Sequence, residues 1–166
     1  VLFSDNIVHH FDDARFSADD KLVFVSPVAL AGNAGPGIYI RDMRSGEFTL
    51  ALQQVPSGGD QSFSEPRISL DGKIIAFTTS AQLSLTDTDT MSDVYVINPV
   101  TGAVKLVSTG FTNDNPSGVN SQPELSGDGR YVLFSSNADG INFSAPFNLW
   151  RVEIATGQAL LVASDV

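Results

Sequence analysis

The sequence predicts an all-β protein built from three four-stranded antiparallel repeats. Short apolar runs alternate with Gly-containing turns, and the whole pattern recurs at a period of about 50 residues. The basic residue after each first turn marks this period, because Lys21, Lys73 and Arg130 are 52 and 57 residues apart. No segment shows the sustained period of about 3.6 residues that an amphipathic helix needs.

Each repeat opens with a hairpin. The three copies read ARFSADDKLVFVS, PRISLDGKIIAFTTS and PELSGDGRYVLFSS. In each copy a short strand and a Ser precede an Asp-Gly or Asp-Asp turn, and a continuous apolar strand follows. Gly supplies the positive φ that tight turns need, so the Asp-Gly pairs predict hairpins. The continuous apolar runs predict strands that neighbouring sheets cover on both faces.

A second hairpin completes each repeat. The aromatic-centred strands GIYIRDM, DVYVINP and NLWRVEI lead into the turns RSGE, VTGA and ATGQ, and a last apolar strand follows each turn. A β-sandwich would not normally repeat its sequence at this period. Four strands in about 50 residues are instead typical of a β-propeller blade. We therefore predict one β-propeller unit over residues 1–166, with blade 1 at 12–54, blade 2 at 65–109 and blade 3 at 123–164.

The repeat resembles that of the TolB-like, or PD40 (WD40-like), β-propeller family. In the second repeat the resemblance is carried by Ser69-Leu70-Asp71-Gly72-Lys73, Phe77, Asp93-Val94-Tyr95-Val96 and Thr101-Gly102. The first repeat departs from it, with Asp19-Asp20 in place of Asp-Gly. The resemblance implies a bacterial periplasmic or extracellular (secreted) protein. It also implies blades that serve as scaffolds, as translocation partners or as propeller domains of peptidases.

Three blades are fewer than the four to eight or so of a typical propeller. They predict an open half-propeller arc with two exposed apolar end faces. Two arcs could close a six-bladed ring as a homodimer, or the chain could be part of a longer propeller. Residues 1–11 are predicted to be an extra strand and loop, because VLFSD resembles the last strand of a blade. The absence of an initiator Met and of a signal peptide indicates a processed, excised or partly covered chain.

Composition limits the partners. The net charge is −10, from nineteen acidic and nine basic residues, which argues against nucleic acid and anionic membranes. No stretch approaches the roughly 18 apolar residues of a membrane span. Cys is absent, so disulfides and thiolate metal sites are excluded. A cationic or neutral partner is favoured.

The long connections of a propeller blade lie at one end of its sheet, which we call the loop end, and the tight hairpin turns lie at the opposite turn end. None of the five long connections, residues 27–36, 55–64, 80–92, 110–122 and 137–146, contains Lys or Arg. The loop end is therefore predicted to be acidic and to bind a cationic protein or peptide. The alternative is a solvated acidic surface that only maintains solubility. The candidate partner-binding residues are Asp60, Phe63, Asp87, Asp89, Phe111, Asp114, Asp139 and Phe143.

The run DTDTMSD is the candidate metal site. It places Asp87 and Asp89 at alternate positions, with Asp93 four residues further on, and Ca²⁺ binds where several oxygens converge in one loop. An EF-hand is excluded, because Ser92 and Asn98 stand where Gly and Glu are required. A looser Ca²⁺ loop would make the protein a Ca²⁺-stabilised extracellular scaffold. Alternatively, Asp and Thr side chains only form turns there, and Asp93 begins a strand.

Enzymatic activity is not predicted. The sequence has no Gly-x-Ser-x-Gly elbow or Walker loop, and its acidic loop residues recur at no shared position in the three repeats. His9 and His10 point opposite ways in an extended segment, although one of them could join Asp12 or Asp13 in a weak metal site. The propeller portion of a larger hydrolase is a further alternative. Six recurrent aromatic residues are predicted to pack between blades: Phe24, Phe77, Phe134, Tyr39, Tyr95 and Trp150.

Overall fold

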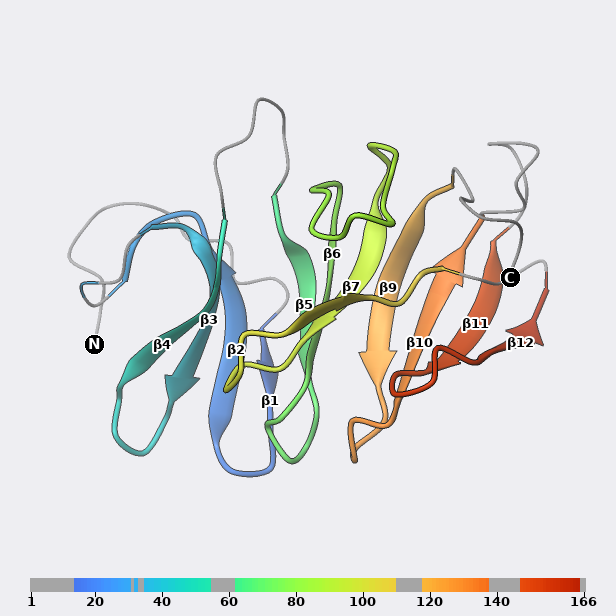
Figure 1. Ribbon diagram of the computed structural model, residues 1–166. Helices are drawn as coiled ribbons and strands as arrows, with labels where there is room; N and C mark the ends of the chain where they lie inside the picture. Colours follow the sequence, from blue (N-terminus) through green and yellow to red (C-terminus); the bar gives the residue numbers. More distant parts are fainter. Residues whose placement is uncertain are drawn as a thin grey trace.

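Three four-stranded antiparallel sheets stand side by side in a row (Figure 1). The computed structural model describes residues 14–30, 32, 35–54, 62–109, 118–137 and 147–164. None of these residues forms a helix, so the described part of the chain offers no helical segment that could cross a membrane. The predicted all-β fold of three antiparallel repeats is confirmed.

Each sheet is one blade, with its strands ordered as in the sequence. Blade 1 contains β1 (Arg15–Phe16), β2 (Lys21–Ser26), β3 (Gly37–Asp42) and β4 (Phe48–Gln53). Blade 2 contains β5 (Ser64–Ile68), β6 (Ile75–Thr79), β7 (Asp93–Ile97) and β8 (Val104–Leu106). Blade 3 contains β9 (Asn120–Leu125), β10 (Tyr131–Ser136), β11 (Asn148–Glu153) and β12 (Ala159–Ala163). The extra strand expected at residues 1–11 lies outside the described residues.

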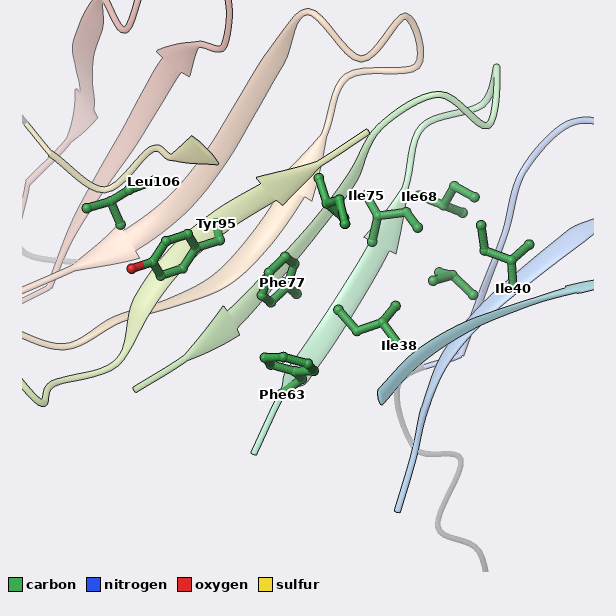
Figure 2. Close-up of a cluster of buried hydrophobic side chains, with 10 residues drawn as sticks. Ile38, Ile40, Phe63, Ile68, Ile75, Phe77, Tyr95 and Leu106 are labelled. Atoms are coloured by element: carbon green, nitrogen blue, oxygen red, sulfur yellow. The ribbon is translucent and has the colours of Figure 1, made fainter. Parts of the chain in front are cut away.

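An apolar cluster fills the space between blades 1 and 2 (Figure 2). Its ten buried residues are Val23, Ile38, Ile40, Phe63, Ile68, Ile75, Phe77, Tyr95, Ile97 and Leu106. The Phe77 and Tyr95 rings are cross-strand partners and stack with centroids 5.9 Å apart. Burial of this much apolar surface is the main force that holds neighbouring blades together.

A second apolar cluster lies between blades 2 and 3. Its seven buried residues are Ala76, Val94, Val96, Val107, Val132, Phe134 and Val152. Successive residues of a strand point to opposite faces, so Ile75 and Phe77 face blade 1 whereas Ala76 faces blade 3. All five residues of β6 are therefore buried, as the continuous apolar run predicted.

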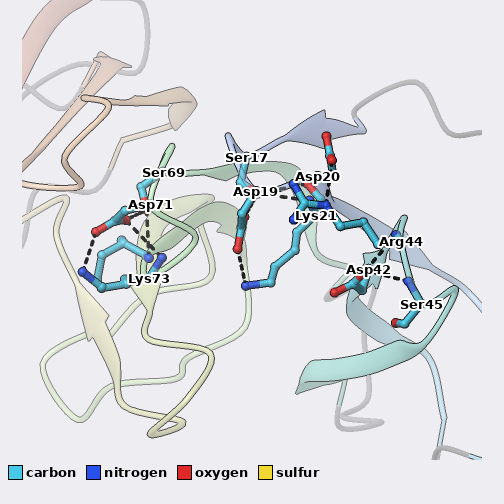
Figure 3. Close-up of polar contacts among 11 residues, drawn as sticks. Ser17, Asp19, Asp20, Lys21, Asp42, Arg44, Ser45, Ser69, Asp71 and Lys73 are labelled. Atoms are coloured by element: carbon cyan, nitrogen blue, oxygen red, sulfur yellow. Dashed lines mark hydrogen bonds and ion pairs between the residues drawn. The ribbon is translucent and has the colours of Figure 1, made fainter.

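A hydrogen-bonded Ser-x-Asp turn joins the first two strands of every blade, and Figure 3 shows the turns of blades 1 and 2. In blade 2, Ser69 Oγ donates to Asp71 Oδ1 at 2.7 Å, and the same oxygen accepts from Lys73 N at 3.1 Å. Ser126 and Asp128 repeat the side-chain contact at 2.7 Å in blade 3. These side chains satisfy the polar groups of the turn, which is why the motif recurs.

The first repeat, which has Asp19-Asp20 in place of Asp-Gly, still forms the same turn. Asp20 has φ of 63°, close to the 71° and 66° of Gly72 and Gly129 at the equivalent positions. Asp is among the few residues other than Gly that enter this left-handed region at modest cost. The Asp-Asp pair therefore replaces Asp-Gly in blade 1 without changing the hairpin.

The position of Phe63 contradicts one expectation from the sequence. It was predicted to be an exposed anchor for a partner, but its side chain is 4% exposed and belongs to the cluster between blades 1 and 2. It packs edge-on against Phe77, with ring centroids 5.3 Å apart. The residue directly precedes β5, so its ring continues the apolar face of the blade beyond the last ladder position.

Replacing Phe63 by Ala is expected to lower the free energy of unfolding by about 3 kcal/mol, because it opens a cavity in this cluster. Phe16→Ala is the matched control, since Phe16 is 59% exposed, and should cost less than about 1 kcal/mol. Urea unfolding at 25 °C measures both. An equal, small loss of stability in both variants would contradict the burial of the Phe63 side chain.

Candidate functional site

The candidate site lies in the connection between β6 and β7, residues 80–92, at the loop end of blade 2. Of the predicted site residues, Phe63, Asp87, Asp89 and Asp93 are described, and the last three lie in or next to this connection. Five others lie outside the described residues: Asp60, Phe111, Asp114, Asp139 and Phe143. The same holds for the candidate weak metal site of His9, His10, Asp12 and Asp13.

The Tyr95 hydroxyl fixes the path of this connection. It accepts a hydrogen bond from Leu83 N at 3.2 Å and donates to Asp87 Oδ2 at 2.5 Å. The equivalent Tyr39 in blade 1 accepts from Leu30 N at 3.2 Å, but it donates to the backbone oxygen of Gly35 at 2.5 Å. Blade 2 therefore has a carboxylate where blade 1 has a carbonyl.

Three carboxylates converge at this point. One carboxylate oxygen from each of Asp87, Asp89 and Asp93 lies within 4.8 Å of the other two. Asp87 and Asp93 are buried, at 6% and 8% exposed, and Asp89 is half-buried. The sequence thus correctly placed three neighbouring acidic side chains, although their function as a metal site stays a prediction.

Asp93 is held from the neighbouring blade as well as from its own. Its Oδ1 accepts hydrogen bonds from Ser108 Oγ at 2.6 Å and from Asn120 Nδ2 at 3.0 Å. Asn120 begins β9 of blade 3, and its backbone N donates to Ser92 O at 2.8 Å. The acidic cluster therefore lies at the junction between blades 2 and 3.

The alternative prediction, that Asp and Thr side chains form turns in the run DTDTMSD, is also correct for part of residues 80–92. Asp89 Oδ1 accepts from Met91 N at 2.7 Å, which is an Asx turn. The Ser84 and Thr86 hydroxyls are 2.8 Å apart. Asp93 is the first residue of β7. Turn formation and convergence of the carboxylates coexist, because each Asp uses only one oxygen in these contacts.

Burial and mutual repulsion oppose ionisation of the cluster. Burial raises the pKa of Asp93 to about 7, and the carboxylates of Asp87 and Asp89 add to the rise. Burial also raises the pKa of Asp87, although its hydrogen bond from Tyr95 offsets part of the effect. The backbone N–H of Asp89 also lowers the pKa of Asp87. Burial, followed by the contact with Asp87, raises the pKa of the Tyr95 phenol.

Charge is distributed differently at the turn end, where acidic groups have basic partners (Figure 3). Among the described residues, four ion pairs lie there: Lys21–Asp19 at 2.6 Å, Arg44–Asp20 at 3.0 Å, Lys73–Asp71 at 3.1 Å and Arg130–Glu153 at 2.8 Å. The carboxylates of Asp87, Asp89 and Asp93 have only neutral hydrogen-bond partners. Within the described residues, no basic side chain forms an ion pair with these carboxylates at the loop end of blade 2.

Three further residues of the site were missed as site residues by sequence reasoning. Tyr95 was assigned to packing between blades, and it both packs there and anchors Asp87. Its recurrence at the position of Tyr39 was a usable signal for a shared loop anchor. Ser108 and Asn120 gave no signal, because they reach Asp93 across 15 and 27 residues.

Comparisons with known proteins show the fold. No family model matches the sequence, and no curated protein matches it. The structure is similar to TolB from Acinetobacter baumannii, with a TM-score of 0.60 and 19% identity over 90% of this chain and 31% of that one. A putative TolB from Agrobacterium tumefaciens gives 0.62 and 20% over 92% and 46%.

The β-propeller domain of the trilobed protease from Pyrococcus furiosus is also similar, with a TM-score of 0.53 and 18% identity over 91% of this chain and 42% of that one. The chain thus spans between about a third and a half of the length of these three proteins. At such identities the likeness concerns the fold. It confirms the β-propeller blades, similar in fold to those of TolB, that the repeat motifs predicted.

The raised pKa of Asp93 predicts a pH-dependent stability. The unfolded chain releases this proton near pH 3.8, whereas the folded protein keeps it to about pH 7. Unfolding between these values releases a proton, so the free energy of unfolding falls as pH rises, by at most about 1.4 kcal/mol per pH unit.

Asp93→Asn removes this proton and should flatten the dependence between pH 5 and 7. Urea unfolding of both proteins, with a chelator present, measures the difference. Parallel curves for wild type and variant would contradict the buried, proton-retaining carboxyl.

Proposed function

We propose that this chain, whose fold is that of TolB-type β-propellers, is a non-enzymatic binding or assembly module. Its acidic loop end would bind a cationic protein or peptide. The observation that carries the proposal is the separation of charge between the two ends. Four of the nine basic residues form ion pairs at the turn end, while the five long connections of the loop end contain no Lys or Arg.

The physical basis is long-range attraction. Carboxylates with neutral hydrogen-bond partners, such as Asp89 with Met91 N, leave a negative potential over the loop end. A rigid scaffold of buried sheets holds these connections, and binding residues commonly lie on loops placed in this way. Such an interface would give fast, salt-sensitive association.

The interfaces between blades bear on how the ring is completed. At the first interface Ile40 of blade 1 shares one apolar cluster with Ile97 of blade 2. At the second interface Val96 of blade 2 shares a cluster with Val152 of blade 3. Each interface thus combines two apolar residues from the third strands of neighbouring blades.

The equivalent positions on the two end faces are arginines. The blades can be superimposed on their aromatic cross-strand pairs, which end in Tyr39, Tyr95 and Trp150. Arg151, one residue after Trp150, then corresponds to Ile40 and Val96. Arg41, two residues after Tyr39, corresponds to Ile97. Arg151 lies 4.6 Å from the centroid of the Tyr131 ring, and Arg41 Nε is buried without a hydrogen-bond partner.

Two copies closing a six-bladed ring would bring Arg151 against the second copy's Arg41, and like charges in an apolar interface are unfavourable. We therefore favour a longer propeller, in which the adjoining blades carry acidic residues, over the homodimer that the sequence left open. The location that accompanies this proposal is the periplasm or the exterior of a bacterial cell.

A second candidate function is the propeller portion of a larger hydrolase. Solved structures similar to this chain include a puromycin hydrolase and the tricorn protease, with TM-scores of 0.53 for both. This chain covers 20% and 18% of those proteins. Under this alternative too, the three blades supply binding and placement rather than chemistry.

Neutralising the loop end should weaken binding of a lysine-rich peptide, used as the probe. The variant Asp60→Asn/Asp114→Asn/Asp139→Asn is expected to lose about tenfold in affinity at low salt. The matched control neutralises three carboxylates of the turn end: Asp20→Asn, Glu47→Gln and Asp128→Asn. Fluorescence anisotropy of the labelled peptide at several NaCl concentrations measures the effect. Equal losses in both variants would show a response to net charge alone and would contradict a defined binding end.

Ring completion is tested separately by molar mass in solution. The wild-type chain is expected to be monomeric at micromolar concentration, because Arg151 and Arg41 oppose self-closure. Arg151→Glu makes the two end faces complementary and should promote dimerisation, whereas the exposed control Arg44→Glu should not. Sedimentation equilibrium distinguishes the states. A tight wild-type dimer would contradict completion by other blades.

A further inference from the structure

Two buried oxygen atoms at the acidic cluster lack any hydrogen-bond donor. They are Asp87 Oδ1 and Asn120 Oδ1, on residues that are 6% and 0% exposed. The described part of the chain has one other buried side-chain atom of this kind, Arg41 Nε. Leaving a buried acceptor unsatisfied costs roughly 1–3 kcal/mol, so such atoms need an explanation. Asp87 Oδ1 belongs to the cluster of three carboxylates, where a positively charged ligand would satisfy it.

We propose that Asp87, Asp89 and Asp93 bind one divalent cation, with Ca²⁺ favoured, and that the ion fastens residues 80–92 to the start of β7. The donor set consists of carboxylate oxygens, which suit hard cations such as Ca²⁺ and Mg²⁺ rather than thiolate- or imidazole-seeking metals. This site does not depend on the identity, or the existence, of a cationic protein partner.

The spacing of the oxygens favours the larger ion. Ca²⁺ binds oxygen at about 2.3–2.6 Å, so two of its ligands can lie up to about 5 Å apart. Mg²⁺ binds at about 2.0–2.1 Å and allows only about 4 Å. Carboxylate oxygens of Asp87, Asp89 and Asp93 that all lie within 4.8 Å of one another can therefore contact one Ca²⁺ with little rearrangement.

Each carboxylate is already oriented by a hydrogen bond to one of its oxygens. Tyr95 holds Oδ2 of Asp87, and Met91 N holds Oδ1 of Asp89. Ser108 and Asn120 both hold Oδ1 of Asp93. The second oxygen of each Asp has no hydrogen-bond donor among the described residues. Neutral donors that fix one oxygen and leave the other for the ion are the usual outer shell of a metal site.

The electrostatics of the loop support the same occupant. Residues 80–92 contain no Lys or Arg, so no cationic side chain of the connection neutralises the three carboxylates. Asn120 links the cluster to β9, because its backbone N donates to Ser92 O and its side chain to Asp93. A bound ion would therefore stabilise the junction between blades 2 and 3 together with the loop.

Ca²⁺ added to chelator-treated protein at pH 8 tests the proposal. At a Ca²⁺ concentration about a hundred times Kd, the melting temperature should rise by about 5–10 °C. NaCl of matched ionic strength should not reproduce the rise. Tb³⁺ should bind the same site and emit on excitation of Tyr95, whose hydroxyl contacts Asp87, and Ca²⁺ should displace it.

Asp89→Asn is the main variant, because Asn can still accept from Met91 N and the half-buried position tolerates it. Its Ca²⁺ affinity by isothermal titration calorimetry should fall at least tenfold, and Asp93→Asn should behave alike. Asp71→Asn, at the turn end, is the matched control and should retain wild-type affinity. No thermal shift with millimolar Ca²⁺, or equal affinity in Asp89→Asn and Asp71→Asn, would overturn the site.

Discussion

The apolar packing of one sheet against the next is the constraint on which the rest of the structure depends. Blade 2 shows it in full, because all five residues of β6 and of β7 are buried. A strand that is buried on both faces needs a neighbouring blade on each side. The blades therefore form a row, and only the outer faces of the first and last blades are left uncovered by this chain. Arg41 and Arg151 occupy those end faces at positions where the interfaces between blades have Ile or Val. At these two positions of the third strand, charged residues thus occur only on the two surfaces that no blade of this chain covers.

This packing also decides where variation is tolerated. The aromatic ladder pairs, Phe24 with Tyr39 and Phe77 with Tyr95, lie opposite each other on the second and third strands of their blades. The tyrosine hydroxyl of each pair anchors the loop that precedes its strand, through Gly35 O in blade 1 and through Asp87 in blade 2. The same anchor therefore supports a neutral loop in one blade and a buried carboxylate in the next. Specialisation of a single blade requires few changes when the scaffold is repeated.

Local chemistry made most of the fold predictable from the sequence. Asp-Gly turns, apolar runs and the repeat period are short-range signals, and even the irregular Asp20 adopts the conformation of Gly72. The candidate site was predictable only as a run of acidic residues. Asn120 lies 27 residues from Asp93, and the burial of Phe63 depends on blade 1, so neither could be read from its neighbours. Long-range packing, rather than local propensity, determines such positions.

The central claim is that the loop end, not the turn end or the acidic charge as a whole, receives a cationic partner. Heteronuclear NMR of the whole chain, titrated with a lysine-rich peptide, locates binding residue by residue. The account predicts saturable shifts in residues 80–92 and none beyond background in the Ser-x-Asp turns around Asp19, Asp71 and Asp128. Shifts spread evenly over both ends, or centred on the turns, would contradict it.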